Sequence, residues 1–261
     1  MPNLSQFIAL GDSLTEGLSD KYPDGTYRGW ADRVADEMSK HSTDFRYANL
    51  AVRGKLIEQV VSEQLHSALP WMRQPQTLVT FHAGANNVLR PKFEPEKVFE
   101  TYQNAVAKIS ETGAKLLLFT VREVGEPKTK TQHYWNQRFG PFNENVKQVA
   151  HQFGATVMDA NSREVFGDPR MLAADRLHLS SEGHRRVAAA VLSAIDLPHD
   201  SDWQDEMPPI RQAPAPLRAI GSVAWGVGFL VPWAARRITG KSSGDGRTAK
   251  HPELINWSPR F

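Results

Sequence analysis

The chain has 261 residues, of which 40% are hydrophobic and 23% charged, a composition typical of a globular protein with one substantial core. Its net charge of +2 is unevenly distributed: residues 1–210 carry −4 and residues 211–261 carry +6, so nothing indicates a nucleic-acid-binding core. Because the chain has no cysteine, disulfides, thiol catalysis and cysteine-ligated metal are excluded.

Apolar runs that predict strands alternate along the chain with segments of helical periodicity. In chain order, the sequence predicts a strand at Phe7–Leu10, a helix at Trp30–Met38, a strand at Arg46–Leu50, a helix at Leu56–Leu65, a strand at Thr77–His82, a helix at Pro95–Ser110, a strand at Lys115–Thr120, a helix at Phe142–Phe153, a strand at Thr156–Asp159 and a helix at Ser181–Ile195. Strand and helix in turn favour parallel strands joined by right-handed crossovers.

The expected fold class is therefore α/β, with three layers (α/β/α) around a central parallel sheet of five strands, over residues 1–197. In such sheets, functional groups gather at the carboxyl ends of the strands. Ser13 follows the first predicted strand, Gly54 the second and Asn86 the third, so we expect all three at one edge of the sheet.

Ser13 and the run Asp175-Arg176-Leu177-His178 together supply a nucleophile, a base and an orienting carboxylate. A serine hydroxyl is a poor nucleophile until an adjacent base takes its proton, and a histidine suits that task. A carboxylate three residues before His178 can return to its Nδ1–H, holding the tautomer and stabilising the imidazolium. This combination indicates an enzyme of acyl transfer.

Four separated blocks of the sequence resemble the GDSL/SGNH hydrolase family of serine esterases and lipases. They are Gly11-Asp12-Ser13-Leu14, Asn49-Leu50-Ala51-Val52-Arg53-Gly54, Gly84-Ala85-Asn86-Asn87 and Asp175-Arg176-Leu177-His178, in the family's order. The resemblance implies a flavodoxin-like fold, with catalytic Ser13, Asp175 and His178. It implies an oxyanion hole of the Ser13 and Gly54 amides and the Asn86 side chain. No cofactor is expected, and because the sequence has no His-Glu-x-x-His or similar spacing, no metal is expected either.

Several neighbouring residues allow more than one interpretation. The third block usually ends in aspartate, where this chain has Asn87, so the hydrogen bonds of that loop are expected to differ while Asn86 is intact. Asp12 is interpreted as a turn-stabilising residue, with the role of triad acid as the alternative. His82 is either a pocket residue or a satisfied buried histidine. Arg53 is either a solvated arginine or a ligand for an anionic substrate group. His184 is expected to be structural or exposed.

The remaining residues, 198–261, predict a Pro-rich linker followed by a basic C-terminal extension. The apolar, aromatic run 217–238 favours packing on the catalytic domain 1–197. The alternative is peripheral membrane contact through 217–241, with arginines on anionic lipid. No signal peptide or spanning segment is evident, which favours a cytoplasmic location.

The expected function is metal-independent hydrolysis of carboxylic esters, acyl or acetyl, through an acyl-enzyme intermediate. The substrate is a small-molecule or lipid ester, and a lipid ester, an acyl thioester and an acetylated sugar all stay open. The alternative is a non-catalytic binding or membrane-associated protein on the same fold, which loss or retention of ester hydrolysis on replacing Ser13 distinguishes.

Overall fold

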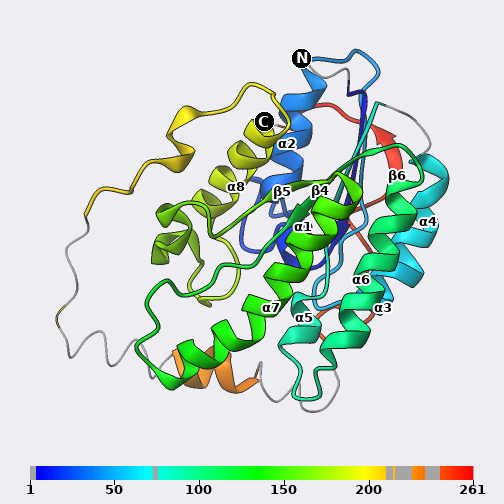
Figure 1. Ribbon diagram of the computed structural model, residues 1–261. Coiled ribbons are helices and arrows are strands. Elements are labelled where there is room, and N and C mark those ends of the chain that lie inside the picture. Colours follow the sequence, from blue (N-terminus) through cyan, green and yellow to red (C-terminus); the bar gives the residue numbers. More distant parts are fainter. Residues whose placement is uncertain (1–3, 73–75, 210–213, 215–224, 233–241, 261) are drawn as a thin grey trace.

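The computed structural model describes residues 4–72, 76–209, 214, 225–232 and 242–260 (Figure 1). Its centre is a sheet with the strand order β5-β4-β3-β1-β2-β6. These strands are β1 (Gln6–Gly11), β2 (Arg46–Asn49), β3 (Thr77–His82), β4 (Lys115–Phe119), β5 (Thr156–Met158) and β6 (His251–Asn256). The first five are parallel to one another, so their carboxyl ends lie at one edge, as predicted.

The predicted α/β class is confirmed, but the sheet has six strands rather than five. The sixth, β6, comes from the C-terminal extension and pairs antiparallel with β2. It has the sequence His-Pro-Glu-Leu-Ile-Asn, with Pro252 and a charged Glu253, and it is mostly exposed or half-buried. Proline and charge are typical of edge strands, and they remove the apolar pattern by which the sequence reveals a central strand.

Helices cover both faces of the sheet and complete the three layers (Figure 1). One face carries α2 (Gly29–Ser39) and α8 (Ser181–Ala194), which pack on the apolar cluster around Trp30. The other carries α6 (Pro95–Ser110), α7 (Lys130–Phe153) and the helical stretch from α3 (Ile57–Gln59) to α4 (His66–Ala68). Strand β1 is fully buried and lies between β3 and β2, so it is a central strand covered by helices on both faces.

Shorter elements lie at the carboxyl edge and in the connections. They are α1 (Ser13–Glu16), α5 (Ala85–Val88), the π-helical η1 (Val60–Leu65) and η6 (Gly226–Leu230), and the 3₁₀ turns η2 (Leu69–Trp71), η3 (Glu164–Gly167), η4 (Pro169–Met171) and η5 (Ser201–Gln204). No helix within the described ranges is both long and apolar enough to cross a membrane.

Helix α7 begins twelve residues before the predicted start at Phe142, at Lys130. Gly140 and Pro141 obscure its first half in the sequence, since both residues disfavour a helix interior. The start is fixed by a capping box, in which the Thr129 hydroxyl accepts from the Gln132 amide at 3.2 Å and the Gln132 side chain accepts from the Thr129 amide at 3.0 Å.

Candidate active site

Ser13 is the first residue of α1, directly after β1 and the N-cap Asp12. The turn depends on Gly11, whose φ is +154°, because a Cβ there would lie 2.6 Å from the His82 carbonyl oxygen and 2.8 Å from Thr15 Oγ1. The strand therefore approaches β3 closely as it ends, and it presents the serine at the carboxyl edge.

Gln64, from the helical stretch between α3 and α4, holds the turn at Gly11 in place. Its side chain bonds both backbone groups of Gly11, accepting from the amide and donating to the carbonyl, each at 2.9 Å. Gln64 lies in the π-helical segment η1 and is buried. A π-bulge shifts the side chains that follow it, and such bulges are frequent at functional sites. Sequence reasoning missed this residue because a helical glutamine 53 positions away carries no motif.

Asp175 and His178 form a hydrogen-bonded pair, as the sequence predicts. Asp175 Oδ2 lies 2.7 Å from His178 Nδ1, and Asp175 Oδ1 accepts from the Leu177 and His178 amides at 3.0 Å each. Burial opposes ionisation of this carboxyl, but the bonds from His178 and the two amides outweigh it and hold the pKa of Asp175 below its ordinary value. The carboxylate is thus ionised and directed at the ring nitrogen.

The loop returns on itself because Arg176 adopts a left-handed conformation, with φ +57°. That conformation costs a residue other than glycine roughly 1 kcal/mol. The loop recovers this cost by its own bonds, among them Ala173 N–H to the His178 carbonyl at 2.8 Å. Arg176 was not predicted to matter, since left-handed arginine has no sequence signature.

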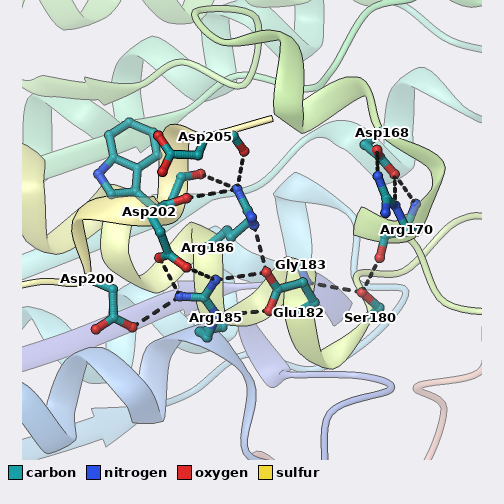
Figure 2. A network of polar contacts seen from close by, with 11 residues as sticks. Asp168, Arg170, Ser180, Glu182, Gly183, Arg185, Arg186, Asp200, Asp202 and Asp205 are labelled. Carbon is teal, nitrogen blue, oxygen red and sulfur yellow. Dashed lines mark hydrogen bonds and ion pairs between the residues drawn. The ribbon is translucent and has the colours of Figure 1, made fainter. Parts of the chain in front are cut away.

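A network of charges fixes the start of α8, just after His178 (Figure 2). Ser180 caps the helix by accepting from the Gly183 amide and donates its hydroxyl to the Arg170 carbonyl. Glu182 pairs with Arg185 and Arg186, and these bonds lower the pKa of Glu182 to about 2. The two arginines also reach the turn at η5, contacting Asp200, Asp202, Trp203 and Asp205. These contacts therefore fix the residues that directly follow His178.

Gly54 lies after β2 with φ +73°. The preceding Arg53 is buried, and its guanidinium and backbone amide both bind the Glu16 carboxylate, the amide at 2.7 Å. Of the two interpretations of Arg53, neither describes this arrangement: it is not solvated, and its charge is taken by Glu16. The pair ties the Gly54 turn to α1, the helix of Ser13.

We expect Glu16→Gln to destabilise the protein by about 3–5 kcal/mol, because a buried guanidinium would lose its counter-charge. Urea denaturation measures the free energy of unfolding. The matched control is Glu37→Gln, which breaks the exposed pair with Lys40 and should cost less than about 1 kcal/mol. Equal losses in the two variants would contradict a structural role of the Glu16–Arg53 pair.

Asn86 and Asp12 are in contact at the start of α5. Asn86 Nδ2 donates to Asp12 Oδ2 at 2.9 Å and to the Lys55 carbonyl at 3.2 Å. Asp12 Oδ1 accepts from the Leu14 amide at 3.2 Å and lies 3.5 Å from His82 Nδ1. Asp12 therefore stabilises the turn, whereas the carboxylate bonded to His178 is Asp175. His82 is buried and also lines the cavity described below.

Asn87 faces α3 rather than the cavity. Its Oδ1 accepts from the Ile57 amide and its Nδ2 donates to Glu58 Oε2, both at 2.9 Å. An aspartate could accept the first bond but not donate the second, and it would place two carboxylates together. Glu58 thus gives a physical reason for asparagine at this position.

Asn87→Asp should lower the free energy of unfolding at pH 7 by about 1–3 kcal/mol, since it replaces a donor by a charge beside Glu58. The double variant Asn87→Asp with Glu58→Gln restores a donor and should recover most of that loss. Thermal denaturation of the wild type, both single variants and the double variant forms the cycle. Additive losses would show that the two side chains are not coupled.

His184 is a buried structural residue, which agrees with the first of its two expected alternatives, structural or exposed. Its Nδ1 accepts from the Trp30 amide at 3.1 Å, and its Nε2 lies 2.9 Å from the Leu18 carbonyl oxygen, to which it donates. Burial lowers the pKa of His184 from 6.5 to about 4. The ring is neutral in the fold and joins α8 to the N-terminus of α2.

Acidification should therefore weaken the fold through His184. Between pH 6.5 and about 4 the unfolded chain binds a proton at His184 that the folded chain does not. As the pH is lowered through this range, the free energy of unfolding therefore falls by about 1.4 kcal/mol per pH unit. Above pH 6.5 the residue is neutral in both states, and the full stability is present. Urea denaturation at pH 7 and pH 5 measures this slope. His184→Gln should show a smaller slope, and an unchanged one would contradict the assignment.

All of the predicted site residues line one cavity of about 760 Å³: Ser13, Gly54, Asn86, Asp175 and His178. The remainder of its lining is largely apolar and includes Leu14, Leu89, Phe119, Trp135, Met158, Phe166 and Leu177. Among the residues that the structure describes, no group of three or more acidic, histidine or cysteine side chains could hold a metal ion.

The model of the GDSL-like lipase/acylhydrolase family matches residues 9–186. The chain belongs to this family. It is a carboxylic ester hydrolase by family, and the match spans all four blocks and ends within α8, the helix after His178. No curated protein matches the sequence of this GDSL-family hydrolase.

Several solved structures, among them two that are named as esterases, share the fold. An acetylxylan esterase from Geobacillus stearothermophilus is 18% identical, with a TM-score of 0.61 over 77% of this chain and 100% of its own. TesA is 20% identical, with a TM-score of 0.58 over 73% and 97%. A psychrotrophic esterase from Pseudoalteromonas, 19% identical with a TM-score of 0.55 over 74% and 97%, was solved inhibited by monoethylphosphonate. Two variants of the Geobacillus esterase, lacking a serine or a histidine, are described as catalytic mutants.

Proposed function

We propose that this GDSL-family hydrolase cleaves carboxylic esters through an acyl-enzyme formed on Ser13. The observation that carries the proposal is the Asp175–His178 pair, 2.7 Å between Oδ2 and Nδ1, in the wall of the cavity that also holds Ser13. The Asp175 carboxylate fixes the proton on Nδ1, which leaves Nε2 of His178 free to act as a base.

In the first half of the reaction, Ser13 Oγ attacks the ester carbonyl carbon and its proton passes to His178 Nε2. The tetrahedral intermediate collapses, the C–O bond to the alcohol breaks, and His178 gives its proton to the leaving oxygen. In the second half, His178 takes a proton from water, the resulting hydroxide attacks the acyl group, and Ser13 recovers its proton as the acid leaves. Asp175 stabilises the imidazolium in both halves.

Negative charge on the carbonyl oxygen would be received by the Ser13 and Gly54 amides and by the Asn86 side chain. Asn86 is preset for this role, because its bonds to Asp12 and to the Lys55 carbonyl hold its amide at the cavity. A contact with the oxyanion would replace the longer of these, the 3.2 Å bond to Lys55. Removing one such donor typically lowers turnover by roughly 100- to 1,000-fold.

The lining of the cavity favours an ester whose acyl chain is longer than acetyl and apolar. Its apolar walls and its volume of about 760 Å³ exceed what an acetyl group needs. The structural neighbour that acts on acetylxylan supports an acetyl ester as the alternative. The membrane contact suggested for 217–241 falls largely outside the described residues, of which this stretch contains only 225–232.

Stopped-flow hydrolysis of p-nitrophenyl acetate in EDTA tests the proposal. An acyl-enzyme whose hydrolysis limits turnover predicts a burst of p-nitrophenolate of about one equivalent per active site, followed by slower steady turnover. The burst and the turnover should survive EDTA, because no step uses a metal. Wild-type protein without ester hydrolysis, or hydrolysis abolished by EDTA, would refute the mechanism.

A further inference from the structure

The C-terminal extension reaches the candidate active site at two places, although the family match ends at residue 186. Phe229 from η6 lines the cavity, and so do Ser242 and Ser243. No residue of the four motif blocks lies in this part of the chain. The extension therefore adds to the site something that the shared fold does not.

The first contact is with the loop of residues 175–178, which holds the Asp175–His178 pair. The Trp225 indole N–H donates to the Asp175 carbonyl at 2.7 Å, and the Arg176 guanidinium lies 4.9 Å from the Trp225 ring. Trp225 in turn stacks with Phe229, with ring centroids 6.3 Å apart and an angle of 28° between the planes. Phe229 is thereby held at the cavity beside the Asp175–His178 loop.

The second contact is with the proposed oxyanion turn. A Cβ built on Gly54 would lie 2.1 Å from Ser242 Oγ, so the hydroxyl packs directly on that glycine. Gly244 approaches equally closely, since a Cβ there would lie 1.9 Å from the Arg53 carbonyl oxygen. Ser242 is fixed by its own turn, in which its amide donates to Asp245 and its hydroxyl accepts from the Gly244 amide.

The chain after this turn is fastened to the fold. Lys250 Nζ lies 2.7 Å from Oδ1 of the fully buried Asp32 in α2 and donates to the Arg28 carbonyl at 2.6 Å. Strand β6 follows at once, and Trp257 then packs edge-on against Tyr47 with centroids 4.9 Å apart. The Ser242 turn is thus held in place by the segment 250–257, which is bonded to α2 and β2.

We propose that the C-terminal extension forms two walls of the substrate cavity and that Phe229 determines which acyl chains bind there. The inference rests on the proposed function, because it assigns the acyl group of that reaction to this cavity. Esters with a chain long enough to reach Phe229 gain an apolar contact, while acetate esters do not. Phe229 is therefore a specificity residue and takes no part in proton transfer.

The test compares kcat/KM for p-nitrophenyl octanoate and p-nitrophenyl acetate in variants of the full chain. Phe229→Ala should lower the octanoate-to-acetate ratio about tenfold, the effect typical of losing one apolar contact in a pocket. Phe229→Trp, which fills the space instead, should lower the same ratio by obstructing the longer chain. Val227→Ala is the matched control, since Val227 lies in the same turn but is 68% exposed and does not line the cavity, and its ratio should stay as in the wild type.

An unchanged ratio in both Phe229 variants, an equal loss on both esters, or the same change in Val227→Ala would overturn the inference. Failure of the proposed function gives a different pattern, in which hydrolysis of both esters is missing in the wild type or persists in Ser13→Ala. Acetate hydrolysis that depends on Ser13, together with an unchanged ratio, would reject the role of Phe229 alone.

Discussion

Ser13→Ala should lower kcat for p-nitrophenyl acetate by at least roughly 10⁴-fold, because removing the hydroxyl removes the attacking group itself. Residual turnover would come from the oxyanion donors and from binding, which are untouched. The change removes one oxygen atom from the first residue of α1 and leaves the N-cap Asp12 in place. The thermal midpoint should therefore stay near that of the wild type.

Ser180→Ala is a useful contrast to this variant. Ser180 is the N-cap of α8, where its hydroxyl accepts from the Gly183 amide. Its loss should reduce the free energy of unfolding by about 1 kcal/mol. The two serines are thus expected to differ in kind, one acting on the rate and the other on stability. A large stability loss and full activity in Ser13→Ala would contradict the assignment.

Asp175→Asn should reduce kcat/KM by roughly 10⁴-fold although it changes one atom. Oδ1 of Asp175 accepts from two backbone amides, so the asparagine oxygen will take that position and its NH₂ will face His178 Nδ1. An amide NH₂ can only donate, which forces the proton of the ring onto Nε2. His178 would then have no lone pair with which to receive the serine proton.

The tautomer can be followed separately from the rate. Nitrogen chemical shifts of the His178 ring should show protonated Nδ1 in the wild type and protonated Nε2 in Asp175→Asn. Asp168→Asn is the matched control, because Asp168 also lines the cavity but pairs with Arg170. Its activity should change less than about tenfold. Wild-type activity in Asp175→Asn would show that another group orients the base.

The sequence was sufficient to predict the fold class because local patterns encode the buried elements. Strands β1, β3 and β4 are short, largely apolar runs with almost every residue buried, and such runs are typical of strands covered on both faces. Strand β6 could not be found this way. It contains Pro252 and Glu253 and gains its place by pairing with β2, about 200 positions earlier in the chain.

The motif residues of the site were predictable, while the residues that support them were not. Ser13, Gly54, Asn86, Asp175 and His178 stand in short blocks at strand ends, and one cavity joins them. Their supports are ordinary residues made specific by distant contacts. Gln64 on Gly11 and Glu16 on Arg53 are separated by 53 and 37 positions, and neither pattern is visible along the chain.

The two contacts of the extension with the site are also contacts between distant positions that the sequence does not reveal. Trp225 on the Asp175 carbonyl and Ser242 on Gly54 join segments about 50 and 190 positions apart. Composition shows that the extension is apolar, aromatic and basic, which favours packing on residues 1–197 but does not predict which residues it contacts. The position of Trp225 depends on its hydrogen bond to the Asp175 carbonyl, and this partner is in place only once the loop of residues 175–178 has folded.

Covalent trapping is the most direct test of Ser13 as the nucleophile. The protein is incubated with an ethyl p-nitrophenyl phosphonate, digested and mapped by peptide mass spectrometry, with Ser13→Ala and Ser180→Ala treated in parallel. We expect one phosphonyl adduct on Ser13, formed in step with loss of esterase activity, retained in Ser180→Ala and absent from Ser13→Ala. Inactivation with the adduct on another residue, or with Ser13 unmodified, would contradict it.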